Sequence, residues 1–247
     1  MSLRDRIRRG LGGEERKRAY VRDLFGRIAG RYDLTNDVMS LGLHRRWKDR
    51  LVELAELEPG HRVLDLAAGT GDLALRAANR AGEGTVVAAD LTPEMMRVGR
   101  RREGAGRIRW TRADALELPF PDRAFDRVLI GYGLRNFPDL SRSLAEIRRC
   151  LRPGGRLLSL DFGKPSAGWL RKVWLRYLEL STTAAGWLLH RDPEAYLYIP
   201  ESLRRYPAQE EVCGLMSRAG FRPCVWIDLM LGTMAIHVAH RPEEPGG

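Results

Sequence analysis

The segment spanning residues 63–72 constrains the fold of this chain more than any other. It reads VLDLAAGTGD, an apolar run that ends in two glycines and an aspartate. Gly69 and Gly71 can adopt backbone angles that side chains forbid, so a strand ends there and a tight turn begins. The small side chains of Ala67 and Ala68 leave room for a ligand beside this backbone. The segment therefore predicts a buried strand, a glycine turn and a helix, which together open a βαβ unit.

Acidic residues accompany the first three predicted strands. Asp65 lies in the first strand, Asp72 follows the glycine turn, and Asp90 and Asp114 close the next two apolar runs. In a βαβ nucleoside pocket, an acid after the second strand accepts hydrogen bonds from ribose hydroxyls. An acid after the third strand can accept one from the exocyclic amine of adenine. We expect these carboxylates to gather at the carboxyl edge of a parallel sheet, where open α/β folds bind ligands.

The same glycine turn also allows a nicotinamide coenzyme. Residues 69–74, GTGDLA, match the pattern GxGxx(G/A). However, a carboxylate at Asp72, directly after the turn, would repel a pyrophosphate at the start of the helix. The same carboxylate would not repel a ligand that presents a sulfonium and an ammonium group. The turn around Thr70 therefore favours S-adenosylmethionine as the cofactor.

The rest of the chain predicts one α/β domain over residues 19–240. Five apolar strand segments, at 62–66, 85–89, 107–111, 125–131 and 156–162, alternate with helical segments. This alternation is typical of a mostly parallel sheet with helices on both faces. Helices are expected from residue 20 to about residue 57. An aromatic helical insertion is expected at 166–208, and a hairpin at 223–239.

The charged ends of the chain are expected to lie outside this domain. The formal net charge is +10, and it is spread along the chain rather than gathered on one module, so no nucleic-acid partner is expected. Residues 1–18 are predicted to form a flexible basic arm that meets anionic lipid headgroups. Residues 241–247 are predicted to be a disordered tail. Without a signal peptide or a spanning helix, the protein is expected in the cytoplasm, with peripheral contact at the inner face of the plasma membrane.

The cysteines give little information about function. Cys150, Cys213 and Cys224 are odd in number and lack metal-ligand spacing. They fit reduced thiols better than a disulfide framework, and no metal site is expected.

Two further motifs resemble a known family. The order of the strands, the glycine turn and the acids resembles class I S-adenosylmethionine-dependent methyltransferases, whose Rossmann-like fold has a seven-stranded sheet. Residues 32–47, YDLTNDVMSLGLHRRW, and residues 133–136, GLRN, resemble signatures of the quinone-biosynthesis C-methyltransferases. This family contains demethylmenaquinone methyltransferase and its ubiquinone-pathway relatives. The sequence departs from the usual pattern at Thr35, Gly131, Asp161 and Gly163, which bears on the substrate side more than on the reaction.

The resemblance implies a set of cofactor contacts. They fall on Thr70, Asp90, Asp114 and Ala115. The residues themselves add Gly69 and Gly71 of the turn and Asp65 of the first strand to the expected cofactor site.

The resemblance also implies methylation of a ring carbon of a polyprenylated hydroquinone. The substrate is most directly demethylmenaquinol, and a benzoquinol of the ubiquinone pathway is the alternative. Arg135 is our candidate for stabilising a ring oxyanion, and His44 for the general base. Asp33 and Tyr32 would form a relay. Alternatively, Arg135 pairs with a carboxylate such as Asp33, and His44 caps a helix or packs against Trp47.

Other classes of function stay open at the level of sequence. They are an RNA methyltransferase, an NAD-dependent oxidoreductase and a non-catalytic cofactor-binding subunit. The oligomeric state is also open, a homodimer included.

Overall fold

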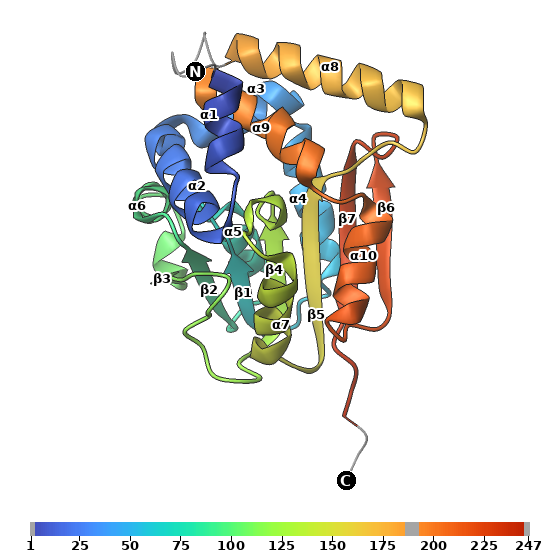
Figure 1. Ribbon diagram of the computed structural model, residues 1–247. Helices are drawn as coiled ribbons and strands as arrows, with labels where there is room; N and C mark the ends of the chain where they lie inside the picture. Colours follow the sequence, from blue (N-terminus) through green and yellow to red (C-terminus); the bar gives the residue numbers. More distant parts are fainter. Residues whose placement is uncertain (1–2, 186–192, 245–247) are drawn as a thin grey trace.

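The predicted seven-stranded sheet is confirmed. The computed structural model describes residues 3–185 and 193–244 (Figure 1). Its strands lie in the order β3-β2-β1-β4-β5-β7-β6. Their bounds are Arg62–Leu66 (β1), Thr85–Asp90 (β2), Ile108–Arg112 (β3), Phe125–Gly131 (β4), Leu151–Phe162 (β5), Cys224–Leu229 (β6) and Met234–His240 (β7).

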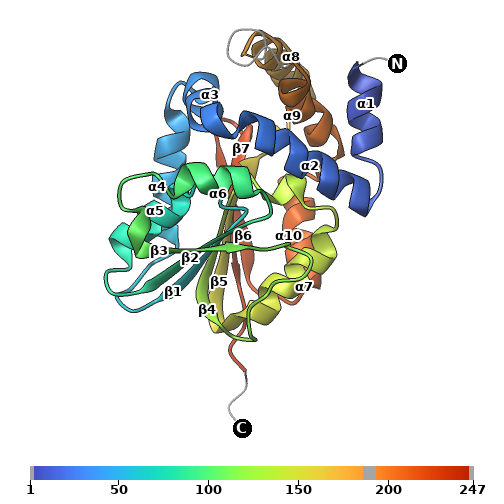
Figure 2. The ribbon, with the colours of Figure 1, turned by 90° about the vertical axis from the view of Figure 1, so that its left-hand side faces the viewer.

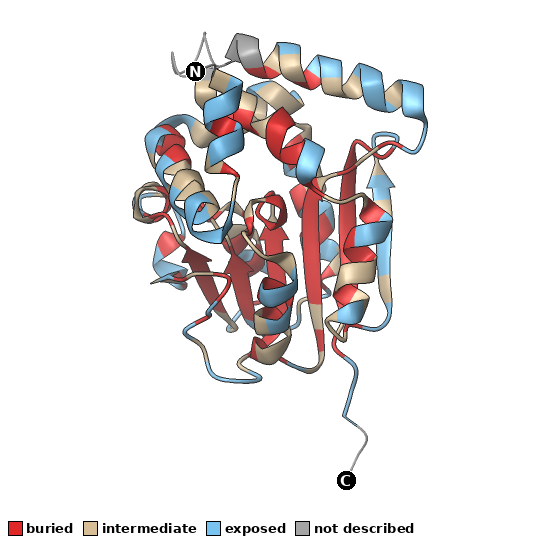
Figure 3. Ribbon diagram, in the orientation of Figure 1, coloured by how far each residue is buried: buried red, intermediate tan, exposed pale blue. Residues whose placement is uncertain are grey.

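The sheet is parallel from β3 to β5, and β7 is its one antiparallel member. In the centre, Leu64 of β1 pairs with Val87 of β2 and with Val128 of β4. Strand β7 runs antiparallel to both β5 and β6. The central strands are apolar on both faces and are buried along most of their length (Figure 3), as a sheet between two helical layers requires.

Helices cover both faces of the sheet (Figure 2). Helices α4 (Leu43–Leu54) and α5 (Asp72–Arg80) pack on one face, and α7 (Leu140–Cys150) and α10 (Gln209–Arg218) pack on the other. The buried positions of α5 follow helical spacing, so its apolar stripe faces the sheet; they are Leu73, Ala74, Ala77 and Ala78.

A helical cap lies over the carboxyl ends of the parallel strands (Figures 1 and 2). It contains α1 (Leu3–Gly10), α2 (Glu14–Ile28), η1 (Ala29–Arg31), α3 (Tyr32–Ser40), α8 (Gly168–Ala185) and α9 (Pro193–Arg205). The shorter elements α6 (Pro93–Gly99), η2 (Ala105–Arg107) and η3 (Leu134–Asn136) follow strands or precede them. Helices α8 and α9 come from the predicted insertion, of which Trp187 lies outside the described residues.

The expectation of a flexible arm over residues 1–18 is wrong for the described part of that segment. Residues 3–10 form α1, and α2 begins at Glu14. Ile7 and Leu11, four positions apart, are buried against Leu24 of α2 and Tyr198 of α9. Burying this apolar pair holds a very charged helix against the cap.

The arginines of α1 are also engaged within the protein. Three of them form ion pairs with acids of α8 and α9, namely Arg4–Glu179, Arg6–Glu194 and Arg8–Glu201. Much of the charge that the sequence assigned to lipid contact is therefore already paired.

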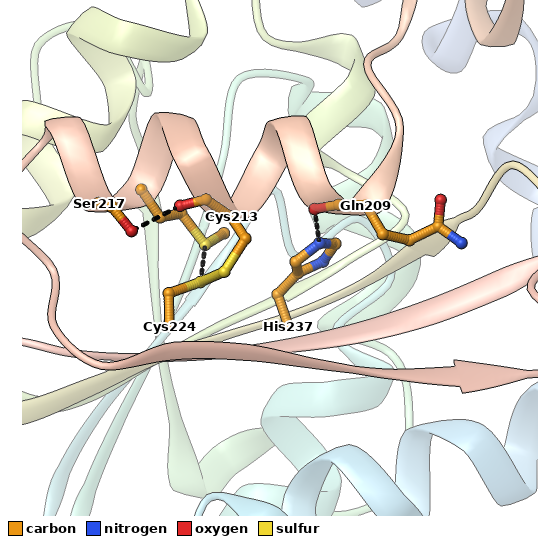
Figure 4. The surroundings of a disulfide bond; sticks show 6 residues. Gln209, Cys213, Ser217, Cys224 and His237 are labelled. Atoms are coloured by element: carbon orange, nitrogen blue, oxygen red, sulfur yellow. Dashed lines mark hydrogen bonds between the residues drawn. A yellow bond between two sulfur atoms is a disulfide. The ribbon is translucent and has the colours of Figure 1, made fainter.

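The expectation of three reduced thiols is wrong for one pair of cysteines. Cys213 of α10 and Cys224 of β6 form a disulfide (Figure 4), with Cα atoms 5.8 Å apart. Their positions are compatible because β6 runs beneath α10 after a short connection, which the spacing of cysteines alone does not reveal. Cys150 is a buried free thiol.

The predicted disordered tail is ordered at its first residue. Arg241 is buried, and its guanidinium donates to the carbonyl oxygens of Arg148 and Leu151, at 2.7 and 2.6 Å. Residues 245–247 of the predicted tail lie outside the described residues. Among the described residues, no helix combines the length and the apolar character needed to span a membrane.

A cofactor cleft and an adjoining apolar pocket

The glycine turn leads from β1 into α5 as predicted. Gly69 and Gly71 have φ angles of 57° and 75°, and Ala67 also has a positive φ of 56°. A Cβ atom at Gly71 would overlap the indole ring of Trp110. The turn therefore needs glycine both for its backbone angles and for the space beneath it.

Asp90 and Asp65 brace this turn from two strands. Asp90, at the end of β2, accepts the backbone N–H of Gly69 at 2.7 Å and that of Thr92 at 2.7 Å. Asp65 accepts the N–H of Ala74 through Oδ2 at 2.8 Å. Its other oxygen, Oδ1, has no hydrogen-bond partner among the described residues, and burial raises the pKa of Asp65 to about 8. Asp65 thus leaves one buried oxygen available to a cationic ligand.

Asp72 is held ionised at the start of α5. Its carboxylate accepts from the Lys48 ammonium at 2.8 Å, and Arg76 and Arg102 lie 3.3 and 3.5 Å away. Burial alone would raise the pKa of Asp72, but Lys48 and the two arginines lower it to about 2. The turn is therefore flanked by Asp65, whose raised pKa favours the protonated form near pH 7, and by Asp72, which is ionised.

Asp114 lies where the third strand approaches the cap. Its Oδ1 accepts the N–H of Leu116 at 3.0 Å, and its Oδ2 accepts from Arg18 of α2 at 2.6 Å. This ion pair fastens α2 over the cleft, and it is largely exposed on the Arg18 side. The neighbouring Ala115 is buried.

These residues surround one cleft between the sheet edge and α2. It encloses about 730 Å³, space open to solvent included. Gly69, Asp90, Asp114 and Ala115 line it. A narrower extension passes Asp65 and the residues that follow it, bounded by Lys48, Ala67, Ala68, Gly69, Thr70, Asp72 and Tyr132. Six of the seven cofactor residues predicted from the sequence thus line the cleft or its extension, whereas Gly71 lines neither.

A second, apolar pocket adjoins the cleft. It encloses about 800 Å³, again with space open to solvent, and is bounded mostly by aromatic and aliphatic side chains of the cap. Phe25, Tyr32 and Tyr132 line both the cleft and the pocket. The two spaces are therefore separated by only a few ring side chains.

Arg135 lines this pocket from η3. It is buried and pairs with Asp161 at 2.7 Å, and it also donates to the carbonyl oxygen of Tyr132 at 2.6 Å. Its guanidinium carbon lies 5.0 Å from the centre of the Phe162 ring. Burial alone would lower the pKa of Arg135, but Asp161 raises it above its ordinary value. The carboxylate partner is thus Asp161 rather than the suggested Asp33.

His44 of α4 lines the same pocket. Its Nε2 lies 3.0 Å from Asp37 Oδ1, and its Nδ1 has no hydrogen-bond partner among the described residues. Burial and the nearby Lys48 lower the pKa of His44 to about 4, with Asp37 opposing them. The imidazole is therefore neutral near pH 7, and its orientation is set by a carboxylate.

The structure separates Asp33 from His44 and Arg135, two of the other proposed catalytic residues. Asp33 accepts from the Thr70 hydroxyl at 2.8 Å and lies 3.4 Å from Arg102, beside the glycine turn. Tyr32 lies at the junction of the cleft and the pocket. The acid beside His44 is Asp37, so the geometry does not support a relay from Asp33 to His44.

Sequence reasoning missed several residues that shape the site. They are Lys48, Tyr132, Asp37 and Arg102. Tyr132 follows β4 with a φ of 61°, and its buried hydroxyl has no partner among the described residues. Lys48 carried one usable signal, a charged residue on the buried face of an amphipathic helix. The others carried none.

The residues present fit S-adenosylmethionine. The buried, partnerless Asp65 Oδ1 suits the cofactor's ammonium group. Asp90 and Asp114 lie at the ends of neighbouring strands, as ribose and adenine contacts require. Asp72 is already paired with Lys48, Arg76 and Arg102, so its charge alone does not distinguish this cofactor from one with a pyrophosphate.

Comparison with solved structures agrees with this fold. The [4+2]-cyclase SpnF matches with a TM-score of 0.62 at 22% identity, covering 81% of each chain. A SAM-dependent methyltransferase from Aquifex aeolicus matches with a TM-score of 0.58 at 17% identity, covering 78% of this chain and 89% of that one. At these identities the likeness concerns the fold alone.

Comparison of sequences is more specific. The model of the ubiE/COQ5 methyltransferase family matches residues 13–241. The ubiquinone/menaquinone biosynthesis C-methyltransferase UbiE of Teredinibacter turnerae is 43% identical, over 88% of this chain and 89% of its own length. UbiE of Azotobacter vinelandii is 43% identical, over 93% and 92%. The chain therefore belongs to the ubiE/COQ5 methyltransferase family and uses S-adenosylmethionine as its cofactor.

Proposed function

We propose that this chain methylates a ring carbon of a polyprenylated hydroquinone, and that its substrate is demethylmenaquinol. The observation that carries the proposal is the apolar pocket, which shares Phe25, Tyr32 and Tyr132 with the cofactor cleft. An aromatic ring bound there would lie next to the methyl donor. The relatives named for both the ubiquinone and the menaquinone pathways support the reaction class.

The polar groups of the pocket suit the activation of a phenol. Bound S-adenosylmethionine supplies an electrophilic methyl group, so the ring carbon has to become nucleophilic. Loss of a ring hydroxyl proton achieves this. With its Nε2–H donated to Asp37, His44 keeps Nδ1 as an acceptor for that proton. Arg135 stays charged at any working pH and would stabilise the phenolate.

The apolar walls serve the rest of the reaction. The mostly aromatic and aliphatic side chains around Phe162, Trp174 and Leu178 would exclude water and give an isoprenoid tail a largely apolar wall. Holding the ring against the shared wall of the cleft replaces a bimolecular encounter by a fixed geometry, which can lower a barrier by several kcal/mol.

Two matched pairs of variants test these roles. His44→Gln is compared with His61→Gln, and Arg135→Gln with Arg127→Gln, because each control residue is also buried but lines neither pocket. With a short-chain demethylmenaquinol, kcat should fall by about 10² for both site variants and stay near wild type for the controls. Binding of S-adenosylhomocysteine should not change in any of them.

One further variant separates catalysis from folding. Arg135→Gln leaves Asp161 buried without its partner, which is destabilising in itself. The double variant Arg135→Gln with Asp161→Asn removes that unpaired charge, so it should fold but keep the low kcat of Arg135→Gln. Near-native turnover in it would remove Arg135 from the mechanism.

The identity of the quinone has a separate test. In a deletion strain, accumulation of demethylmenaquinone supports the proposal. A ubiquinone precursor that lacks a ring methyl group assigns the chain to the benzoquinol instead. A chain that binds S-adenosylhomocysteine but methylates neither quinol, nor total RNA, would contradict the proposed function altogether.

A further inference from the structure

The outer side of α8 exposes large apolar side chains in a regular stripe. Trp169, Val173, Tyr177 and Leu180 are all exposed, and Trp169 reaches 70% exposure. Their spacing of four, four and three residues places them along one side of the helix. The opposite side of α8 carries the buried Leu178 and faces the pocket. The helix is therefore apolar on both sides, and the described residues of the protein cover only one of them.

Helix α3 extends this stripe. Leu34, Val38 and Leu41 are exposed, again at helical spacing, and Leu41 is 85% exposed. Helices α3 and α8 are in contact at the end of the molecule that carries the cap (Figures 1 and 2). We call the seven exposed residues of the two helices the outer apolar face. Such a set of large side chains is unusual on a protein surface that meets only water.

Basic side chains border the outer apolar face. Lys172 and Arg176 of α8 are exposed within one helical turn of Val173, and Arg176 also pairs with Glu179 at 3.6 Å. The acids of α3 and α8 all have cationic partners, as the ion pairs Arg102–Asp33, Arg45–Asp37 and Arg204–Glu179 show. An apolar stripe with a net positive rim matches the chemistry of an anionic lipid surface. It matches a second copy of the chain less well, because two basic rims would repel each other.

The face and the apolar pocket share their walls. Met39 of α3 and Trp174 and Leu178 of α8 line the pocket from the inner sides of the two helices. A molecule that leaves the pocket between α3 and α8 would therefore pass directly into whatever covers the outer apolar face. This continuity favours a partner with a hydrocarbon interior.

We propose that the outer apolar face docks the protein on an anionic lipid bilayer, with α3 and α8 lying in the headgroup region. The docking surface goes beyond the proposed function and stands on exposure and charge alone, although a prenylated substrate would give it a purpose. It also relocates membrane contact from the N-terminal segment, whose arginines are paired within the cap.

Vesicle co-sedimentation of the full chain tests the proposal. The probe is an equimolar mixture of phosphatidylglycerol and phosphatidylcholine, without quinone or cofactor. The double variant Trp169→Ser with Val173→Ser should lower the partition coefficient at least tenfold, since it removes two large apolar side chains from the interface. The matched control, Trp226→Ser with Val225→Ser, alters the same residue types on exposed positions of β6 and should bind as wild type.

The charge contribution is tested separately. Lys172→Gln and Arg176→Gln should each weaken binding about fivefold, because a cation near an anionic surface contributes about 1 kcal/mol. The effect should disappear with vesicles of phosphatidylcholine alone. Brominated lipid should quench tryptophan fluorescence in wild type and in the β6 control, but much less in Trp169→Ser.

The outcomes separate the possibilities. Equal vesicle binding by all variants, or no binding by wild type, overturns the proposal. A wild-type dimer that becomes a monomer on Trp169→Ser with Val173→Ser, without vesicles, assigns the face to a second copy and also overturns it. Turnover of a short-chain quinol tests the proposed function independently: if turnover fails while the matched variants differ on vesicles, docking stands and the proposed function falls.

Discussion

Asp65 has a raised pKa, so that a bound cation can change its charge near neutral pH. It is buried at the end of β1, and burial raises its pKa to about 8. One of its oxygens is committed to the Ala74 N–H, and the other has no partner among the described residues. Near pH 7 the free protein therefore holds a proton that an ammonium-bearing ligand would have to displace.

This arrangement predicts a pH-dependent affinity for S-adenosylhomocysteine. The ligand's ammonium favours the ionised form of Asp65, so binding at pH 7 should release a proton. Affinity should then rise by up to about tenfold per pH unit between pH 6 and pH 8. Isothermal titration calorimetry in two buffers of different ionisation enthalpy measures the proton count. In Asp65→Asn the release should vanish and binding should weaken; wild-type binding without proton release would contradict the assignment.

At the residue scale, prediction from sequence works where a residue's position along a strand decides its role. Asp90 and Asp114 fall at strand ends, and a strand end is visible in a single apolar run. The partners of charged residues are less accessible, because they come from separate segments. Lys48 pairs with Asp72 across 24 residues, and Arg135 pairs with Asp161 across 26. His44 pairs with Asp37 rather than with the suggested relay acid because Asp37 in α3 and His44 in α4 lie on either side of the short turn that joins the two helices.

At the scale of elements, the turn between β1 and α5 is the most tightly constrained. Gly71 and Gly42 have the same φ of 75° and each precedes a helix. A Cβ at Gly71 would overlap Trp110, whereas a Cβ at Gly42 would meet nothing within 4 Å. A side chain at Gly42 would therefore add backbone strain alone, whereas one at Gly71 would add the same strain and a steric clash.

Alanine substitutions at these glycines should differ in their effect on stability. Gly42→Ala should lower the free energy of unfolding by roughly 1–2 kcal/mol, the usual penalty for a side chain in the left-handed region. Gly71→Ala adds the clash with Trp110 and should lower it by about 1–3 kcal/mol more. Urea unfolding of both variants measures the difference. Equal losses would mean that the indole ring moves aside freely.

The elements themselves were predictable to different degrees. The first four predicted strands agree with the observed ones within one residue because their apolar runs are bounded by glycine, proline and acidic residues. The predicted start of β5 is wrong: the strand begins at Leu151, five residues before the predicted start at 156, and runs through the Pro-Gly-Gly segment. Helix α1 was missed because charged residues dominate its composition. Its packing depends on Ile7 and Leu11, a signal of only two side chains, and on α9, which lies nearly 200 residues later in the sequence.

At the scale of the whole molecule, the chain divides into a sheet with two helical layers and a cap that closes the strand edge. The sheet and its two helical layers can be predicted from the alternation of strand and helix segments in the sequence. The cap does not, because segments from both halves of the sequence build it. For the same reason the net charge of +10 was misleading, since arginines of α1 compensate acids of α8 and α9 instead of forming a free basic arm.

The placement of β7 has a consequence for biosynthesis. Residues 234–240 pair with Arg156–Phe162 of β5 on one side and with β6 on the other. A nascent chain halted on the ribosome after residue 220 would contain every acid of the cofactor cleft, yet β5 would present a bare edge in the middle of the future sheet. We therefore expect such a chain to be captured by chaperones and not to retain labelled S-adenosylhomocysteine, while one halted with residue 241 clear of the exit tunnel does. Retention by the shorter nascent chain would show that the parallel half matures without its last strand.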